Sequence, residues 1–305
     1  MPIQIYSFLL TDAQVARIDV NAILSFLVVT GSVLGGFAMV DGPFHVLVQP
    51  SEFVVIGGAA FGALIGSAPL PTVMRVFKDF GMVFKGSGIK KETYYQLMGL
   101  LLTIFTVIRK EGVLGVEKDL ADPHHSERFN KFPLIANNHH VMDLLVGSLR
   151  LFVDGVVNAF DLDKLMETEI ETHHHEAASS PNLLTKVGDA LPGIGIVAAV
   201  LGIIVTMQHL DGPPSEIGHH VAAALVGTFI GILFSYGYMQ PIAAHLEMIN
   251  GETHTLLNSV RAAVVAFAGG APPAVALEFA RKSISGSLRP STEEMDQLQQ
   301  EIRKG

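Results

Sequence analysis

The sequence contains no cysteine and no tryptophan, and it has few charged residues. Without cysteine the chain has no disulfide bond, no thiolate metal site and no cysteine nucleophile. Without tryptophan it lacks the usual belt at a membrane surface, for which Tyr236 and Tyr238 are weak substitutes. Only 16% of the residues are charged, and the net charge of −9 gives no reason to expect nucleic-acid binding. The chain is instead apolar, with a mean hydropathy of +0.43, which is typical of a membrane protein with an aqueous part.

Four apolar stretches carry the membrane signal, at residues 21–40, 52–68, 190–207 and 221–243. Each is about long enough to cross a hydrocarbon layer of ~30 Å. None has a carboxylate in its core, and the polar residues Thr30, Thr206 and Thr228 are not proton carriers. If the protein handles ions, we therefore expect the titrating group to come from another chain.

Basic residues predict which loops lie in the cytoplasm. Loops 41–51 and 208–220 contain no Lys or Arg, whereas residues 69–189 contain thirteen and residues 244–305 contain six. Because basic loops stay on the cytoplasmic side, both termini and the middle segment are placed there. The predicted order is an N-terminal cytoplasmic extension (1–20), two transmembrane helices with a short periplasmic loop (21–68), a cytoplasmic helical domain (69–189), two further transmembrane helices (190–243) and a cytoplasmic C-terminal helix and tail (244–305). No cleavable signal peptide is expected, and residues 3–10 are either a membrane-surface segment or an extension of little consequence.

The middle segment contains an apolar run that is too short to be a fifth crossing. Residues 97–108 lie between two pairs of basic residues. An apolar run of this length is too short to cross a bilayer and favours a buried helix of an aqueous domain. Another helix is predicted by four apolar residues that share one helical face, Met142, Leu145, Leu149 and Phe152. Residues 272–284 indicate a short helix, and the charged end 293–305 indicates a mobile tail. The sequence thus predicts an all-α, polytopic membrane protein with four transmembrane helices and a helical cytoplasmic domain.

Small residues recur at every fourth position within the apolar stretches. The stripes are Gly31 with Gly35; Gly58 with Gly62 and Gly66; and Ala223 with Gly227, Gly231 and Ser235. In lipid, such stripes let helix backbones approach closely. The sequence leaves open whether the contacts form within one subunit or between subunits.

Three residues in the last two stretches have a plain and a functional interpretation. Pro192 is either a helix start or a hinge, and Pro241 is either a tolerated kink or a hinge. Thr228 either bonds the carbonyl four residues back in its own helix or faces a polar path. The residues by themselves favour the plain interpretation in each case.

Histidines and surface charges give weaker signals. The histidines occur as adjacent runs such as His173–His175, whose members point in different directions on a helix, so no metal site is expected. Arg109, Lys110, Glu111 and Glu117 border the buried helix, where charges form either a solvated face or a docking surface. No nucleophile–base pair or cofactor motif stands out, so neither an enzyme nor a bound cofactor is expected.

Several strings resemble the MotA-type flagellar stator subunits of the MotA/TolQ/ExbB proton channel superfamily. The resemblance is carried by VGDALPGIGIVAAVLGII at 187–204 and ALVGTFIGILFSYGYMQPIA at 224–243, and it extends to METEIETH at 166–173 and APPAVALEFARKSI at 271–284. It covers nearly the whole chain from about Ile23. The four-span layout with a large segment between the second and third spans also matches.

The resemblance implies roles for seven residues. Pro192 and Pro241 correspond to hinge prolines, and Thr228 to a threonine of the ion path beside an aspartate of the partner. Ala198 and Ala199 stand where sodium-type relatives carry a threonine, which favours protons as the coupling ion. Arg109 and Glu117 correspond to charges that engage the rotor protein FliG.

The resemblance also implies the assembly and its location. We expect a ring, a pentamer of this subunit, around a dimer of a single-span MotB-type partner, surrounded by lipid in the bacterial inner membrane. The function implied is coupling of proton flow to torque on the rotor. An ExbB/TolQ-like energy-transducing ring is the alternative, although those proteins usually have three spans. A self-contained channel or transporter would need its own intramembrane polar site, which the apolar spans do not indicate.

Overall fold

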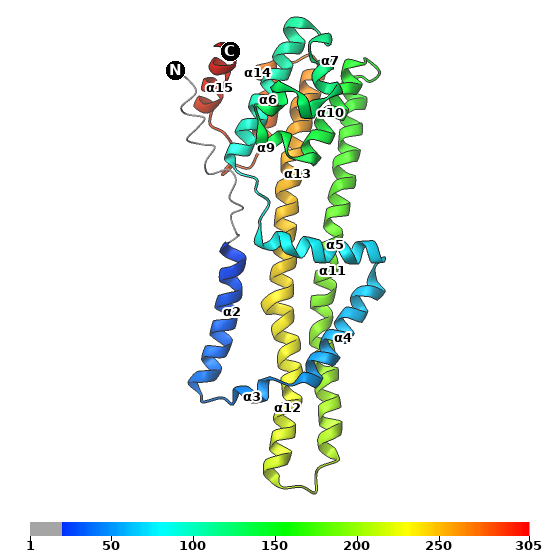
Figure 1. Ribbon diagram of the computed structural model, residues 1–305, viewed down its shortest axis with the longest axis vertical. Coiled ribbons are helices and arrows are strands. Elements are labelled where there is room, and N and C mark those ends of the chain that lie inside the picture. The colour runs from blue at the N-terminus through cyan, green and yellow to red at the C-terminus, as the bar shows by residue number, and fades with distance from the viewer. Residues whose placement is uncertain (1–19, 305) are drawn as a thin grey trace. The chain divides into compact units, whose positions relative to one another are not determined.

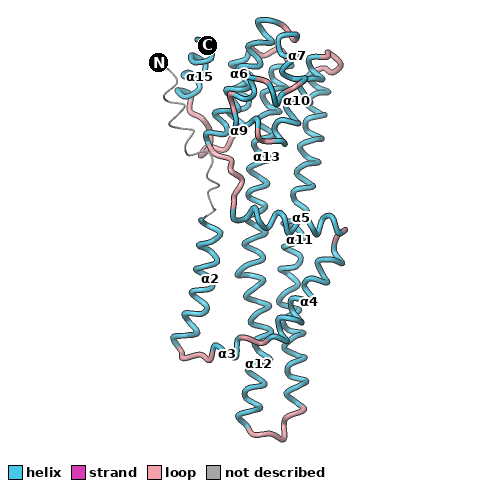
Figure 2. The backbone as a smooth tube through the Cα atoms, viewed as in Figure 1, coloured by secondary structure: helices cyan, strands magenta, loops and turns pink. Residues whose placement is uncertain are grey.

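The computed structural model describes residues 20–304, and every regular element in that range is a helix (Figures 1 and 2). The described chain forms two compact units. Unit 1 comprises residues 20–88 and 177–249, and unit 2 comprises residues 89–176 and 250–304. The predicted segment 69–189 therefore contributes its middle to unit 2 and both ends to unit 1, and the five-part division by function stays a prediction.

Unit 1 contains the apolar helices. Its elements are α2 (Val20–Met39), α3 (Phe44–Leu47), α4 (Pro50–Ser67), α5 (Leu70–Phe80), η1 (Gly81–Phe84), the second part of α11 (Ala159–Met207), α12 (Pro214–Ile232), the π-helix η3 (Leu233–Met239) and the start of α13 (Gln240–Ala268). Between residues 20 and 304, four helical segments are long and apolar enough to cross a membrane, which confirms the predicted all-α fold with four spans. The predicted starts of the first two spans differ from those of α2 and α4 by one or two residues.

The helices α11 and α12 form an antiparallel hairpin whose contact face is made of the smallest residues (Figure 1). A Cβ atom built on Gly202 would lie 2.7 Å from the Cβ of Ala224, and one on Gly231 would lie 2.9 Å from the Cα of Gly195. The backbones therefore approach as closely as glycine permits. The stripe that includes Gly231 thus packs within the chain.

Unit 2 is built around the helix that the sequence marks as too short to cross a membrane. Its elements are α6 (Lys91–Glu111), α7 (Leu114–Ala121), η2 (Pro123–His125), α8 (Glu127–Asn130), α9 (Pro133–Ala136), α10 (His139–Val153), the first part of α11, the rest of α13, α14 (Pro273–Ser283) and α15 (Thr292–Lys304). The side chains of Leu97, Leu101 and Phe105 in α6 are fully buried. Phe105 stacks on Phe267 with ring centroids 4.2 Å apart. The buried helix predicted for residues 97–108 is confirmed.

Two local expectations are wrong. The end of the chain is not an unstructured tail, because α15 buries Met295 and Leu298 in the core of unit 2. Pro192 does not start a helix, because α11 runs without interruption from Ala159 to Met207. The expectation for residues 3–10 lies outside the described residues.

The helix α5 is a further element that the sequence interpretation missed. It buries Val73 and Val76 but exposes Leu70, Met74 and Phe77. An apolar exposed face at helical spacing suits a membrane surface. The helix belongs to unit 1 rather than to the aqueous core of unit 2.

Candidate functional site

The predicted ion-path residues converge on one level of the α11–α12 hairpin. Ala198 is 1% exposed, and its Cβ lies 3.0 Å from where a Cβ on Gly227 would stand. The backbone nitrogen of Ala199 lies 3.2 Å from the same point. Thr228 follows Gly227 directly, and its Cα lies 3.3 Å from where a Cβ on Gly195 would stand. Residues from both helices of the hairpin therefore meet at Gly227.

Thr228 differs from the other membrane threonines. Thr30 and Thr206 each donate a hydrogen bond to the carbonyl four residues back, at 2.7 Å and 2.8 Å. Thr228 is half-buried and makes no hydrogen bond of this kind within the described chain. Its hydroxyl therefore keeps its donor for a group outside this chain or for water.

The structure adds a residue that the sequence interpretation missed, Glu52 in the first turn of α4. Its side chain is 7% exposed, and Oε2 is buried without a hydrogen-bond partner in the described chain. That oxygen lies 2.5 Å from where a Cβ on Gly227 would stand. In the sequence Glu52 marks the outer end of an apolar stretch, and nothing there shows that α4 begins against the middle of the hairpin.

The two prolines lie where α11 passes the beginning of α13. Pro192 is inside α11, and Pro241 is the second residue of α13, with Gln240 between it and the π-helix η3. Proline has no N–H, and the wider turn before it lets Gln240 donate its backbone N–H to Ser235 instead. The Gln240 side chain also donates to Asp189 Oδ1 at 3.1 Å, which joins the two helices next to both prolines. A π-turn beside a proline is a common place for a helix to bend.

Arg109 and Glu117 occupy an exposed corner of unit 2. Arg109 is in the last turn of α6, Glu117 is in α7, and Gly112 joins the two helices with a φ of 77°. Both side chains are exposed. Two arginines from neighbouring elements hold α7 in place. Arg128 pairs with Asp119, and Arg150 Nε donates a hydrogen bond to the Leu120 carbonyl at 3.0 Å. The corner is thus a rigid surface that presents charge to water.

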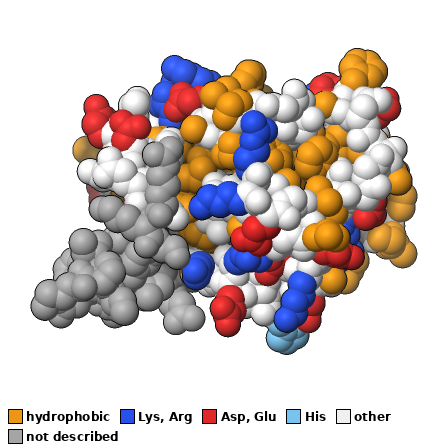
Figure 3. All heavy atoms as spheres, turned by 90° about the horizontal axis from the view of Figure 1, so that it is seen from above, with side chains coloured by type: hydrophobic (Ala, Val, Ile, Leu, Met, Phe, Trp, Pro, Cys, Tyr) orange, Lys and Arg blue, Asp and Glu red, His pale blue; other side chains and the backbone are white. Residues whose placement is uncertain are grey.

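Figure 3 shows how charged side chains are distributed over one face of the molecule. Lys and Arg side chains alternate there with Asp and Glu side chains and with apolar ones. Among the described residues on this face no single sign of charge prevails, so the face offers individual charged groups rather than a uniform field.

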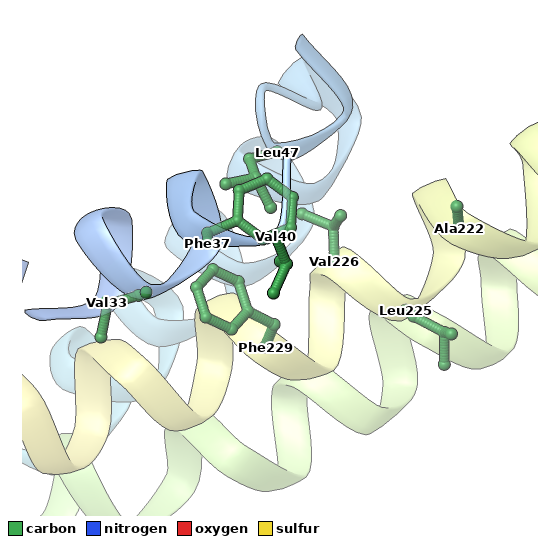
Figure 4. A pocket seen from close by; sticks show the side chains of 9 residues that line it. Val33, Phe37, Val40, Leu47, Ala222, Leu225, Val226 and Phe229 are labelled. Atoms are coloured by element: carbon green, nitrogen blue, oxygen red, sulfur yellow. The ribbon is translucent and has the colours of Figure 1, made fainter. Parts of the chain in front are cut away.

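A pocket of about 420 Å³ opens between α2, α3 and α12, and its lining is apolar (Figure 4). Phe37 and Val40 approach Phe229 across it. The lining offers no side chain that binds an ion. The polar level of the hairpin around Gly227 is therefore a separate feature from this pocket.

Histidines form close pairs in unit 2 without forming a metal site. The rings of His140 and His173 are 4.3 Å apart, and those of His174 and His254 are 4.7 Å apart. Between residues 20 and 304, no three His, Asp or Glu side chains are grouped to hold a metal ion.

Comparisons with known proteins agree on the family. Residues 23–112 match the family described as "Motility protein A N-terminal", and residues 137–258 match the "MotA/TolQ/ExbB proton channel family". Motility protein A of Salmonella typhimurium is 37% identical over 92% of this chain and 95% of its own length. Motility protein A of Escherichia coli is 37% identical over 90% of this chain and 93% of its own length.

Two solved structures share the fold. The Campylobacter jejuni structure described as "C. jejuni MotAB" matches with a TM-score of 0.74 at 23% identity, over 90% of this chain and 99% of that one. The "flagellar MotAB stator complex from Bacillus subtilis" matches with a TM-score of 0.72 at 21% identity, over 91% of this chain and 99% of that one.

The fold and the site define a multi-pass membrane protein of the ion-channel class, not an enzyme. The identity to two motility proteins over nine-tenths of the chain is more specific. The chain belongs to the motility protein A (MotA) family, whose members are proton-channel stator subunits of the flagellar motor.

Proposed function

We propose that this subunit, with a dimer of a single-span MotB-type partner, couples proton flow across the inner membrane to torque on the rotor. The observation that carries the proposal is the meeting of Ala198, Ala199 and Thr228 at one level of the α11–α12 hairpin. These are the positions that the family resemblance assigns to the ion path. The orientation that puts the loops without basic residues in the periplasm leaves unit 2 and both termini in the cytoplasm.

Assembly as a ring, a pentamer by family resemblance, is supported by glycines that face open space within the part of the chain that the structure describes. A Cβ on Gly58, Gly62 or Gly66 of α4 would meet nothing within 4 Å, and the same holds for Gly31 and Gly35 of α2. Small-residue stripes favour helix–helix contacts in lipid. Both solved relatives are described as MotAB complexes, which supports a multimeric assembly with the partner.

The proposed cycle begins when a proton from the periplasm reaches the partner's aspartate near Thr228. Neutralisation of that carboxylate removes the cost of moving a charge past apolar walls. The ring then advances relative to the partner dimer, and the proton leaves on the cytoplasmic side near Pro192 and Pro241. One charge crossing 100 mV provides about 2.3 kcal/mol, so torque requires many such steps.

The general test is deletion and complementation in a motile host that carries this chain and its partner. Deletion is expected to abolish swimming and to leave energised outer-membrane transport intact, and restored motor speed is expected to follow the proton gradient and not sodium. Loss of outer-membrane transport with normal swimming would instead establish an ExbB/TolQ-like function.

The hinge role is tested with Pro241→Ala and Pro192→Ala. Each variant returns a backbone N–H to the helix, and the π-helical hydrogen bonding of η3 is expected to revert to the α-helical pattern in Pro241→Ala. Motor torque at normal protein level is expected to fall in both variants. Pro181→Ala is the matched control. Pro181 also lies inside α11, but it is not one of the two prolines to which the hinge role is assigned. Unchanged torque in the Pro192 and Pro241 variants would remove the hinge role.

The rotor role is tested by reversal of charge in Glu117→Lys. This variant is expected to impair motility while the protein assembles normally, and a compensating charge reversal in FliG is expected to restore it. Glu301→Lys, which changes an exposed residue of α15, is the matched control. Normal motility of Glu117→Lys would remove Glu117 from the rotor interface.

A further inference from the structure

We propose that Glu52 is a proton-binding group of the ion path, so that this chain contributes a titrating carboxylate of its own against Gly227, the residue that precedes Thr228. The inference rests on the proposed function, because it assumes that protons pass along this level of the hairpin. It changes the role of the ring from a passive wall to a participant in proton transfer.

The first support is the burial of the carboxyl group. The Glu52 side chain is 7% exposed, and its Oε2 is shielded from solvent without a hydrogen-bond donor. Glu52 lies in the first turn of α4, where the helix dipole favours an anion, but no hydrogen-bond donor replaces the hydration of Oε2, so a carboxylate ion there is costly. Uptake of a proton removes that cost and turns the group into a neutral acid.

The second support is that its neighbours leave room for it. Gly227 of α12 has no side chain where Oε2 stands, since a Cβ there would lie only 2.5 Å from this oxygen. On α11 the methyl group of Ala198 lies 3.0 Å from the same point. A larger residue at position 227 would displace the carboxyl group, so the space is specific to a glycine at this position.

The third support is the absence of a counter-charge in the apolar segments of unit 1. The helix α5, which also packs against α4, carries Arg75, Lys78 and Asp79, but it follows the other end of α4 in the chain. Residues 190–207 of α11, residues 221–235 of α12 and η3, and all of α2 contain no ionisable side chain. Glu52 is the one ionisable residue of α4, and α3 adds His45, which is exposed. Because these segments offer no basic side chain, a proton is the species that can neutralise Glu52 there.

The chemistry is a reversible proton transfer between carboxyl groups. A proton from the periplasmic side forms an O–H bond on Glu52. That bond then breaks as the proton moves, through Thr228 or a water molecule, to the partner's aspartate. Glu52 returns to the anion and the aspartate becomes neutral, so charge and protons balance. Each subunit of the ring would bring one such group to the partner in turn.

The main test compares Glu52→Gln with Glu52→Asp in the complete complex with its partner. Gln keeps the size and both hydrogen-bonding capacities but cannot exchange a proton, whereas Asp keeps the acid. We expect Gln to lower proton flux and torque by about tenfold or more and to remove one ionisation from the pH profile of flux. Asp is expected to retain flux with a shifted pH profile. The matched control is Thr206→Val. Thr206 is a buried polar residue on α11 whose hydroxyl donates a hydrogen bond to a carbonyl of its own helix.

The outcomes separate this inference from the proposed function. If the unaltered complex gives no proton-driven flux, the proposed function fails and the inference fails with it. If the unaltered complex conducts and Glu52→Gln conducts equally well with the same pH profile, only the role of Glu52 is overturned.

A second measurement decides the case in which both variants are inactive. The infrared spectrum of the purified ring without its partner is expected to contain a carbonyl band of a protonated carboxylic acid near neutral pH. That band is expected to disappear in Glu52→Gln and at high pH. If the unaltered ring and the Gln variant have the same spectrum at every pH, Glu52 is permanently ionised and the proposal is wrong.

Discussion

Helices pack against each other both in the α11–α12 hairpin of unit 1 and around α6 in unit 2, but the side chains at the two contacts differ in size. The hairpin joins through Gly195, Gly202 and Gly231, whereas α6 buries Leu101 and Phe105 completely. In water, removal of large apolar side chains from the solvent drives packing. In lipid that drive is missing, and close backbone contact takes its place. The comparison shows that residue size at a helix contact indicates which solvent surrounds it.

The two units also treat carboxylates differently. In unit 2, Arg281 donates a hydrogen bond to Glu278 at 2.8 Å, and this bond lowers the pKa of that carboxyl group. Arg261 donates in the same way to Asp163 at 2.7 Å. In unit 1, Glu52 is buried without a partner for Oε2. Charge therefore stabilises unit 2, whereas in unit 1 an uncompensated acid is a functional candidate.

The largest effect is expected in the core of unit 2 for Phe105→Ala. The change removes the stack on Phe267 and leaves a cavity, so the free energy of unfolding is expected to fall by about 3–5 kcal/mol. Denaturant titration of the purified protein measures it. Leu114→Ala, at a site 76% exposed, is the control and is expected to change it by about 0.5 kcal/mol or less. Equal losses in the two variants would contradict the large-residue core.

A smaller effect is expected in the hairpin for Gly231→Ala. The added Cβ would lie 2.6 Å from the Leu191 carbonyl oxygen, so the helices must separate at a cost of about 1–3 kcal/mol. Resistance to detergent and to proteolysis measures this loss. Gly218→Ala, on the same helix with nothing within 4 Å of its Cβ, is expected to cause none. If Gly218→Ala weakens the hairpin as much, close backbone contact is not the cause.

A third effect concerns the attachment of α15 to unit 2. Ser291 Oγ accepts a hydrogen bond from the Glu294 N–H at 3.2 Å, and the Glu294 carboxylate accepts one from the Ser291 N–H. Ser291→Ala removes half of this capping box and is expected to cost about 1 kcal/mol. Faster hydrogen exchange in residues 292–304 measures it, with the exposed Ser287→Ala as control. Unchanged exchange would mean that Met295 and Leu298 alone hold the helix.

The smallest effect is a sensitivity of unit 2 to mild acid. Burial, followed by the nearby His174, lowers the pKa of His254, while Glu171 opposes the shift. Because the unfolded chain then binds protons more readily than the folded one, stability is expected to fall as the pH drops below about 6.5. His254→Phe keeps a ring against His174 and is expected to reduce this acid loss. Thermal unfolding between neutral pH and pH 5 measures it, and the exposed His124→Phe should leave the loss unchanged.

Sequence reasoning located the spans well because their signal is local. Lipid-facing helices need about twenty apolar residues in a row, and such runs are visible without a fold. The same reasoning missed α15, although Met295, Leu298 and Ile302 follow helical spacing behind Ser291 and Glu294. Because most residues of this segment are charged or polar, the three apolar residues on one face of the helix were not recognised as a core contact. The hinge, ion-path and rotor roles of the predicted residues remain predictions, and the structure adds the places that those residues occupy.

By itself, the sequence determined that this is an all-α membrane protein with four spans, and its strings pointed to the MotA family. These properties follow from composition and from order along the chain, because the bilayer acts on each helix separately. Only the tertiary structure decided that the acid of α4 lies against Gly227 and that the glycines of α12 meet α11 rather than another subunit. The first of these contacts joins residues 175 positions apart, and the geometry of both exists only once the backbones have packed.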